Sequence, residues 1–127
     1  MQEKHLYEYA VIRVLPRVDR EEFINVGVIL YCAPKNFLRA ECAIDEGRLK
    51  TFAGNADFGE LNEHLKSLCR ICKGGEEAGP IGKLSMGERF RWLTAPRSTI
   101  VQTSPVHTGL TADPERTLDD LLSKLVK

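Results

Sequence analysis

The sequence lacks the glycine-rich signatures with which proteins most often hold nucleotide phosphates. Neither G-x-x-x-x-G-K-[ST] nor G-x-G-x-x-G occurs among its 127 residues, so the common nucleotide-binding loops are absent. The chain also has no G-x-S-x-G turn of the kind that presents a catalytic serine. These absences argue against the most widespread nucleotide-dependent and hydrolytic enzymes.

The chain has no excess of charge of either sign. Its 18 lysines and arginines balance 18 aspartates and glutamates, and neither sign forms a block. Binding to a phosphate backbone depends on clustered basic side chains that displace counterions, so this balance argues against a nucleic-acid-binding protein. No stretch approaches the roughly 20 apolar residues of a membrane helix, and no apolar signal region follows Met1–His5. We therefore expect a cytoplasmic protein that does not enter the membrane.

Cysteine is too sparse for a disulfide scaffold. A chain of this length can build its own core, so we expect Cys32, Cys42, Cys69 and Cys72 to be reduced. Cys69 and Cys72 have the spacing of zinc and thioredoxin motifs, but no second Cys or His pair stands at zinc-finger spacing and no strand precedes them. They are expected to pack as small apolar side chains in a helix. The sequence predicts no metal site and no cofactor.

Alternation of side chains in the first third of the chain predicts three strands. Residues 7–15 are rich in β-branched and aromatic side chains and end at Pro16. Residues 23–32 alternate more sharply and place one apolar row on a single face, formed by Ile24, Val26, Val28, Leu30 and Cys32. A turn at residues 33–36 leads into a third alternating stretch, residues 37–44. Three strands joined in this way form an antiparallel meander.

The remainder of the chain predicts helices with recognisable starts. Capping boxes begin with Asp57 and Ser85, and Asp113 followed by a proline begins the last helix. The predicted helices span residues 45–53, 57–73, 85–95 and 113–126. Glycines and a proline make residues 74–83 a flexible loop, and residues 99–104 are predicted as a further strand.

These elements predict a single α+β domain over residues 1–127. The antiparallel sheet has about four strands, and an apolar sheet face needs a helical layer to cover it. We therefore expect one face of the sheet to be covered by three to four helices. No internal repeat and no linker divides the chain.

The segment from Arg97 to Thr111 is the most unusual stretch, because it gathers polar side chains without an acidic residue. These are Arg97, Ser98, Thr99, Gln102, Thr103, Ser104, His107, Thr108 and Thr111. Hydroxyls, an amide, an imidazole and a guanidinium can together hold a carboxylate, a phosphate or a peptide backbone. The alternative is a threonine-rich edge strand with a solvated return loop, in which Pro105 protects the edge from mispairing.

Two polar residues in the predicted strands are further binding candidates. Arg13 and Asn25 stand where a purely structural sheet favours apolar side chains, and buried polar groups need partners. They could line a polar surface shared with Arg97 or Glu22. The alternative is a surface arginine and an amide at the end of a strand.

A catalytic triad is a weaker interpretation of the same segment. Ser98 or Ser104 could be combined with His107 and Asp113, but the sequence has neither a nucleophile elbow nor an evident oxyanion loop. A triad is defined by geometry rather than by residue types. We predict no catalytic residue.

Three stretches resemble a known family. They are Y-E-Y-A-V-I-R-V from Tyr7, F-I-N-V-G-V-I-L from Phe23 and P-R-S-T-I-V-Q-T-S-P-V-H-T-G-L from Pro96. Together they resemble the bacterial family catalogued as domain of unknown function 3037, over nearly the whole chain. The family has no established activity. Members that resemble this chain are often encoded beside kinases of the HipA type, so the resemblance implies an accessory or regulatory partner of such a kinase.

Two functional hypotheses follow. The first is a non-enzymatic regulator that binds a protein, possible partners including a HipA-like kinase, through the Arg97–Thr111 segment or the strand face with Arg13 and Asn25. The second is a small ligand-binding or enzymatic domain in which Arg97 clamps an anion and His107 handles a proton. Arginine is the favoured fork for carboxylate and phosphate, and histidine changes charge near neutral pH.

Overall fold

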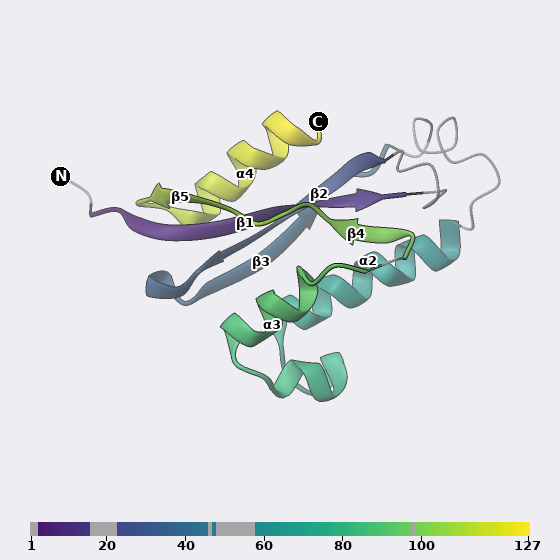
Figure 1. Cartoon of the computed structure of the whole chain (residues 1–127), viewed down its shortest axis with the longest axis horizontal. Helices are drawn as coiled ribbons and strands as arrows, with labels where there is room; N and C mark the ends of the chain where they lie inside the picture. Colours follow the sequence, from purple (N-terminus) through teal and green to yellow (C-terminus); the bar gives the residue numbers. More distant parts are fainter. Residues whose placement is uncertain (1–2, 16–22, 46, 48–57, 98) are drawn as a thin grey trace.

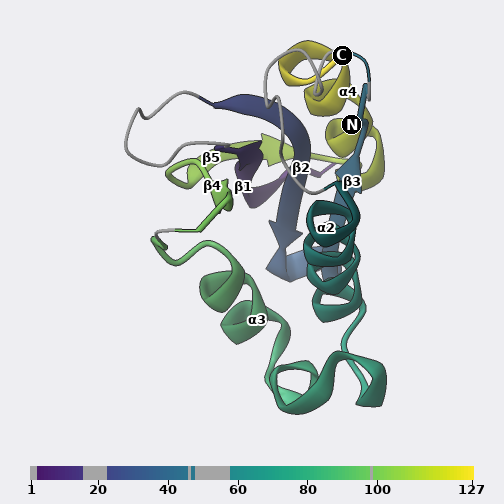
Figure 2. The same cartoon turned by 90° about the vertical axis from the view of Figure 1, so that its right-hand side faces the viewer.

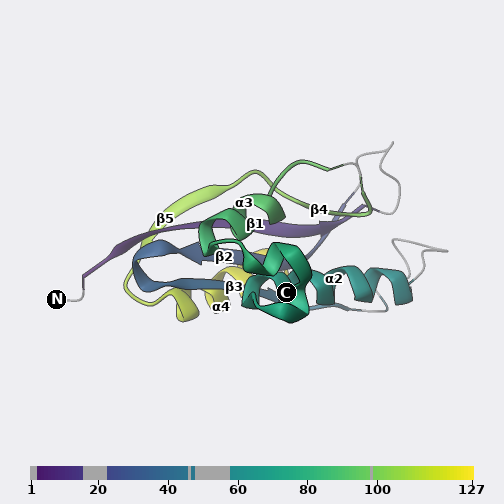
Figure 3. The same ribbon diagram turned by 90° about the horizontal axis from the view of Figure 1, so that it is seen from below.

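An antiparallel sheet forms the centre of the structure, a computed structural model that describes residues 3–15, 23–45, 47, 58–97 and 99–127. Within the described residues it has five strands, β1 (His5–Val14), β2 (Ile24–Cys32), β3 (Phe37–Cys42), β4 (Val101–Thr103) and β5 (His107–Thr111). The order is β3-β2-β1-β4, and β5 pairs with the first half of β1 while β4 pairs with its second half. Figure 3 shows β4 and β5 along one edge of the sheet, beside β1.

Helices cover both faces of this sheet. The described helices are α2 (Phe58–Lys73), α3 (Met86–Leu93) and α4 (Pro114–Leu125), with short 3-10 turns η2 (Ala33–Lys35) and η3 (Glu76–Lys83). Figure 1 shows α4 above the sheet and α2 and α3 below it. The α+β class is confirmed, but the helices are divided between two faces where the sequence predicted one covered face. None of the described helices is long and apolar enough to cross a membrane.

An irregularity in β2 explains why both faces are apolar. Ile12 pairs with Gly27 and Arg13 pairs with Asn25, so Val26 is an extra residue in a β-bulge. A bulge reverses the alternation of the residues that follow it. Ile24 and Val26 therefore pack in the cluster with α2 and α3, whereas the second half of the predicted apolar row packs against α4, namely Val28, Leu30 and Cys32. The expectation of one unbroken row is wrong for this reason.

The predicted helix starts are confirmed where the structure describes them. Ser85 Oγ accepts from the Glu88 amide at 3.2 Å and the Ser85 amide donates to Glu88 Oε1 at 3.3 Å, which is the predicted capping box of α3. The Asp113 side chain accepts from the Arg116 amide at 3.2 Å and caps α4. The predicted helix over residues 45–53 and the cap at Asp57 lie almost wholly outside the described residues. Residues 74–83, predicted as a loop, contain the 3-10 turns of η3.

A buried arginine joins α2 to α3. Arg89 is 8% exposed, and its Nη1 donates to the carbonyl oxygens of Ile71 at 2.8 Å and Cys72 at 2.7 Å. Its Nε donates to the carbonyl oxygen of Leu84 at 3.2 Å. A cation here satisfies carbonyls that the end of a helix leaves unpaired and lies at the negative end of the helix dipole. Arg89 thereby fixes α3 relative to the last turn of α2.

Candidate functional site

A groove lies between α2, the end of α3 and β4, and we name it the α2–β4 groove. Its volume is about 300 Å³, and Figure 2 shows how α2, α3 and β4 are arranged. Buried apolar side chains form its floor, chiefly Leu68, Ile71 and Leu93. Trp92, Ala95 and Val101 also line it, together with six polar side chains, namely His64, Ser67, Arg97, Thr99, Gln102 and Thr103. No acidic residue lines the groove, so it offers an apolar surface edged by hydrogen-bonding and basic groups.

Trp92 and Arg97 form the most prominent feature of this groove. The guanidinium carbon of Arg97 lies 4.0 Å from the centre of the Trp92 ring, and Nη2 of Arg97 donates to the Trp92 carbonyl oxygen. Trp92 is 40% exposed and is the single tryptophan of the chain. Stacking on the ring holds the guanidinium in place. No carboxylate in the described part of the chain pairs with Arg97, which is exposed.

Local hydrogen bonds shape the chain that leads from Arg97 into β4. Thr99 Oγ1 donates to the carbonyl oxygen of Val101 at 2.7 Å, and Gln102 Nε2 donates to the carbonyl oxygen of Thr99 at 2.9 Å. The amide of Leu15 donates to the carbonyl oxygen of Ile100 at 2.7 Å and ties this turn to β1. The polar side chains at this end of the segment are therefore held close to the groove by their own backbone.

The structure brings together part of the predicted site. Arg97, Thr99, Gln102 and Thr103 line the α2–β4 groove, and Ser98 lies outside the described residues. The sequence pattern did not reveal Trp92 or the α2 side of the groove. The signal for α2 was its periodicity, because its lining residues recur at steps of three and four along one face, namely His64, Ser67, Leu68 and Ile71.

Ser104 has a structural role between β4 and β5. It is 2% exposed, and its Oγ accepts from the amide of Val11 at 2.8 Å and donates to the carbonyl oxygen of Pro105 at 2.9 Å. The amide of Ser104 donates to the carbonyl oxygen of Val11 at 2.8 Å. The serine hydroxyl thus accepts the hydrogen bond of the Val11 amide in place of a backbone carbonyl, at the point where β1 stops pairing with β5 and begins to pair with β4. Residues 107–111, predicted as a return loop in one interpretation, are the strand β5.

His107 is not a lining residue of the groove. Its ring lies 5.3 Å from the ring of Tyr9, the residue of β1 that pairs with it in the sheet. Tyr9 packs in the hydrophobic cluster that includes α4. His107 is exposed, whereas Thr111 is buried, and its Oγ1 lies 2.6 Å from Thr117 Oγ1 and accepts from the amide of Asp113 at 2.9 Å. Thr108 is exposed on β5. The structure therefore separates His107 from Arg97.

Arg13 and Asn25 pair across β1 and β2, outside the groove. The guanidinium carbon of Arg13 lies 4.0 Å from the centre of the Phe23 ring, and Asn25 Nδ2 donates to the carbonyl oxygen of Leu125 at 3.0 Å. Arg13 Nε and Asn25 Oδ1 are buried and have no hydrogen-bond partner in the described part of the chain. β4 pairs Arg13 with Gln102, so the arginine lies on the strand next to the groove.

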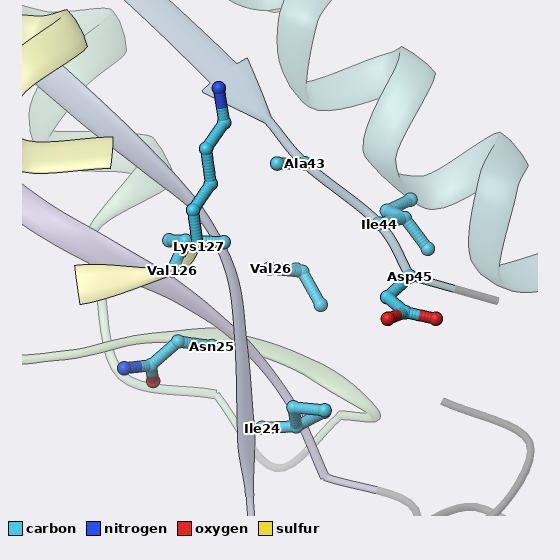
Figure 4. Close-up of a pocket in the computed structure, with 8 residues that line it drawn as sticks. All are labelled: Ile24, Asn25, Val26, Ala43, Ile44, Asp45, Val126 and Lys127. Carbon is cyan, nitrogen blue, oxygen red and sulfur yellow. The ribbon is translucent and has the colours of Figure 1, made fainter. Parts of the chain in front are cut away.

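A second cavity, of about 330 Å³, lies where β2 and β3 approach the end of α4. Figure 4 shows its lining, in which the Lys127 side chain points away from the Asp45 carboxylate. The rest of the lining is mostly apolar, formed by Ile24, Val26, Ala43, Ile44 and Val126 beside Asn25. Polar groups do not converge here as they do in the α2–β4 groove, which is therefore the better candidate site.

A family model matches nearly the whole chain. The family described as "Protein of unknown function (DUF3037)" matches residues 9–126, in agreement with the resemblance seen in the sequence. No curated protein and no solved structure matches the chain. Among the described residues, no group of three or more His, Cys, Asp or Glu is arranged to hold a metal ion.

Proposed function

The chain belongs to the DUF3037 family, and from this premise we propose that it is an accessory or regulatory protein that binds another protein through the α2–β4 groove. The observation that carries the proposal is the Trp92–Arg97 stack beside an apolar floor. Tryptophan and arginine are the residues most enriched among those that dominate binding energy at protein interfaces. Apolar contact surrounded by polar groups is the usual composition of such an interface.

The size of the groove supports a protein partner. About 300 Å³ is at the lower end of the range for small-molecule pockets, roughly 300–1,000 Å³. A cavity of this size accommodates one large apolar side chain of a partner, and the polar groups around it can bind the partner's backbone. Leu68 and Ile71 would contact the inserted side chain, and Thr99 and Thr103, which also line the groove, would bind the backbone.

The first partner to test is a HipA-like kinase. Proteins that resemble this chain are often encoded beside such kinases, and a regulator encoded beside its target is a common arrangement. The kinase would insert an apolar side chain beside Trp92 and place an acidic group near Arg97. This partner is a proposal that rests on the family resemblance, whereas the location of the contact rests on the groove.

Co-purification and calorimetric titration with the neighbouring kinase test the proposal. Trp92→Ala and Arg97→Ala should each weaken binding at least tenfold, because interface residues of this kind typically contribute about 2 kcal/mol or more. Arg116→Ala is a matched control, since Arg116 is exposed on α4, far from the groove lining. Absence of a complex at micromolar concentrations would reject the kinase as partner. Undiminished binding by both groove variants would reject the groove.

A second candidate function is recognition of a small anionic ligand. Arg97 favours it, because its guanidinium is fixed by Trp92 and has no carboxylate partner among the described residues. The geometry does not support the accompanying role of His107, which lies on β5 against Tyr9. A thermal-shift panel of nucleotides and small acids tests this function. A ligand of the groove should raise the melting temperature of the wild type and leave that of Arg97→Ala unchanged.

A further inference from the structure

The strand β5 lies at an edge of the sheet. Within the described residues it pairs with β1 alone, so one side of the strand has no neighbour there. Figure 3 shows β5 along the outer margin of the sheet, with β1 on its inner side. The edge of a sheet presents unpaired N–H and C=O groups to any extended segment that can pair with them. Another strand can therefore be added beside β5.

The pairing with β1 fixes which backbone groups of β5 point outward. The Val11 amide donates to Ser104 Oγ, and the Val11 carbonyl oxygen accepts from the Ser104 amide, so both groups of Val11 point to the β4–β5 side. Alternate residues of a strand direct these groups to the same side, so the other odd-numbered residues of β1 do likewise. Their partners on β5 are also odd-numbered. The N–H and C=O groups of Thr108 and Leu110 therefore point away from the sheet.

β5 has none of the residues that usually protect a sheet edge. Natural edges are blunted by charged side chains and prolines. The strand at the opposite edge, β3, contains Arg39 and Glu41. β5 contains no lysine, arginine, aspartate, glutamate or proline. Pro105, which one interpretation of the sequence gave a protecting role, precedes β5 and does not interrupt it.

Two exposed leucines lie beside this edge. Leu6 of β1 and Leu110 of β5 are directly opposite each other in the sheet. They are 57% and 64% exposed, the two highest values among the large apolar side chains of the described residues. Single exposed apolar side chains are ordinary, whereas neighbouring ones form the kind of patch that marks an interaction site. The outward backbone groups and this apolar pair together form what we call the β5 edge.

We propose that the β5 edge pairs with the β5 edge of a second copy of the chain, so that the two sheets join across a two-fold axis. An antiparallel pair of identical strands has two-fold symmetry, so each strand meets on its copy the same free groups that it offers. When Gly109 lies opposite Gly109 of the second copy, Thr108 of each copy lies opposite Leu110 of the other. The outward N–H and C=O groups of these two residues then bond to each other in reciprocal pairs.

The charges around β5 fit a second copy as partner. His107 begins the strand and Asp113 follows its end, and both are exposed. Antiparallel pairing places the start of one strand beside the end of the other, so each imidazole approaches a carboxylate. The cap of α4 uses only Oδ1 of Asp113. Glu8, opposite Thr108, is already paired with Arg91, so the pairing does not place like charges opposite each other, which would be destabilising.

The dimer should be weak, and it uses residues separate from the α2–β4 groove. One short strand from each copy makes a small interface, and interfaces at the low end of the size range are typically transient. We therefore expect a dissociation constant in the micromolar range or above. None of the residues that line the groove lies on β5 or in the first half of β1. The proposal is therefore independent of the partner that binds the groove.

Analytical ultracentrifugation of the full chain at micromolar to millimolar concentrations tests the proposal. The mass of the wild type should rise toward twice that of one chain. Leu110→Lys places a charge in the apolar patch of each copy and should raise the dissociation constant at least tenfold. Leu84→Lys is the matched control, since Leu84 is also exposed but lies outside the β5 edge, and it should dimerise as the wild type does. A wild type that stays monomeric, or a Leu110→Lys variant that dimerises equally well, would overturn the proposal.

A pair of substitutions at one position tests the backbone pairing itself. Thr108→Pro removes an N–H group that points outward, so the pairing with β1 keeps its own hydrogen bonds. Thr108→Val keeps the N–H group and a residue type that favours strands. With circular dichroism spectra like that of the wild type, Thr108→Pro should be monomeric and Thr108→Val dimeric. Equal dimerisation of the two folded variants would contradict pairing through this edge.

Amide hydrogen exchange in the wild type, followed by NMR, needs no variant to fold. Exchange at Thr108 and Leu110 should slow as the protein concentration rises, because their N–H groups become bonded to the second copy. Exchange at Gly109 and Thr111, whose backbone groups face β1, should be slow at every concentration. Unchanged exchange at Thr108 and Leu110 over a range in which the mass doubles would show that the copies meet elsewhere, and the proposal would fail.

Discussion

Similar polar residues in the two halves of the segment from Arg97 to Thr111 are used in opposite ways, the exposed His107 and Thr108 excepted. In the first half, Arg97 and Thr103 line the α2–β4 groove, which we propose as the binding surface. In the second half, Ser104 and Thr111 are 2% and 6% exposed and bond to the protein's own backbone. The residue type alone therefore does not show which polar side chains line the groove and which bond to the protein's own backbone. The position of each residue relative to β1 distinguishes them, because the buried hydroxyls lie where the pairing of β1 with its neighbouring strands is interrupted or ends.

Arg89 gives the largest expected effect and tests what supports the groove. Arg89→Ala should lower the free energy of unfolding by about 3 kcal/mol, because hydrogen bonds to charged groups are stronger than neutral ones and buried carbonyls would lose their donor. Urea unfolding monitored by circular dichroism measures the change. Arg91→Ala, two positions along the same helix, is the control. Arg91 is exposed and pairs with Glu8, so its loss should cost about 1 kcal/mol or less.

If Arg89→Ala is as stable as Arg91→Ala, the hydrogen bonds of Arg89 between α2 and α3 do not stabilise the fold around the groove. The groove would then have to be held by its apolar floor alone.

Ser104 tests the scaffolding half of the segment directly. Ser104→Ala removes the acceptor of the buried Val11 amide and should lower the free energy of unfolding by about 2 kcal/mol. Ser123→Ala is the control, because Ser123 is exposed on α4 and such substitutions change stability by about 0.5 kcal/mol or less. Equal stability of the two variants would mean that the bond between Ser104 and Val11 contributes nothing.

Two threonines of β5 give a smaller and sharper comparison. Thr111→Val removes the acceptor of the Asp113 amide at the start of α4 and should cost about 1 kcal/mol. Thr108→Val, on the same strand but exposed, should be nearly neutral, since both residue types favour strands. The difference between their thermal midpoints measures the effect. The scaffolding role of Thr111 fails if Thr108→Val is the more destabilising change.

The sequence predicted the elements better than their positions. The strands β1 to β3 and the starts of α3 and α4 follow from alternation and capping residues, which act locally. The bulge at Val26 was not predictable in this way, because a prediction from alternation assumes that every residue of the strand is paired. One extra residue moves the side chains of half the strand to the other face of the sheet. As a result α4 lies on a face of the sheet that was expected to be open.

The candidate site was predictable only in part, for a related reason. The polar stretch identified Arg97 and Thr99, because an unusual composition is visible in the sequence. Arg89 was not predictable, since its partners are backbone carbonyls that have no residue-type signature. Such contacts depend on packing, which spacing along the chain does not encode.

The most direct test measures stability and affinity together in Arg97→Ala and Ser104→Ala. Urea unfolding and titration with the proposed partner, a HipA-like kinase, should give opposite results for the two variants. Arg97→Ala should keep wild-type stability within about 0.5 kcal/mol and lose at least tenfold in affinity. Ser104→Ala should lose stability and, while folded, bind as the wild type does. Reduced affinity in folded Ser104→Ala together with full affinity in Arg97→Ala would contradict the division of the segment into a recognising and a scaffolding half.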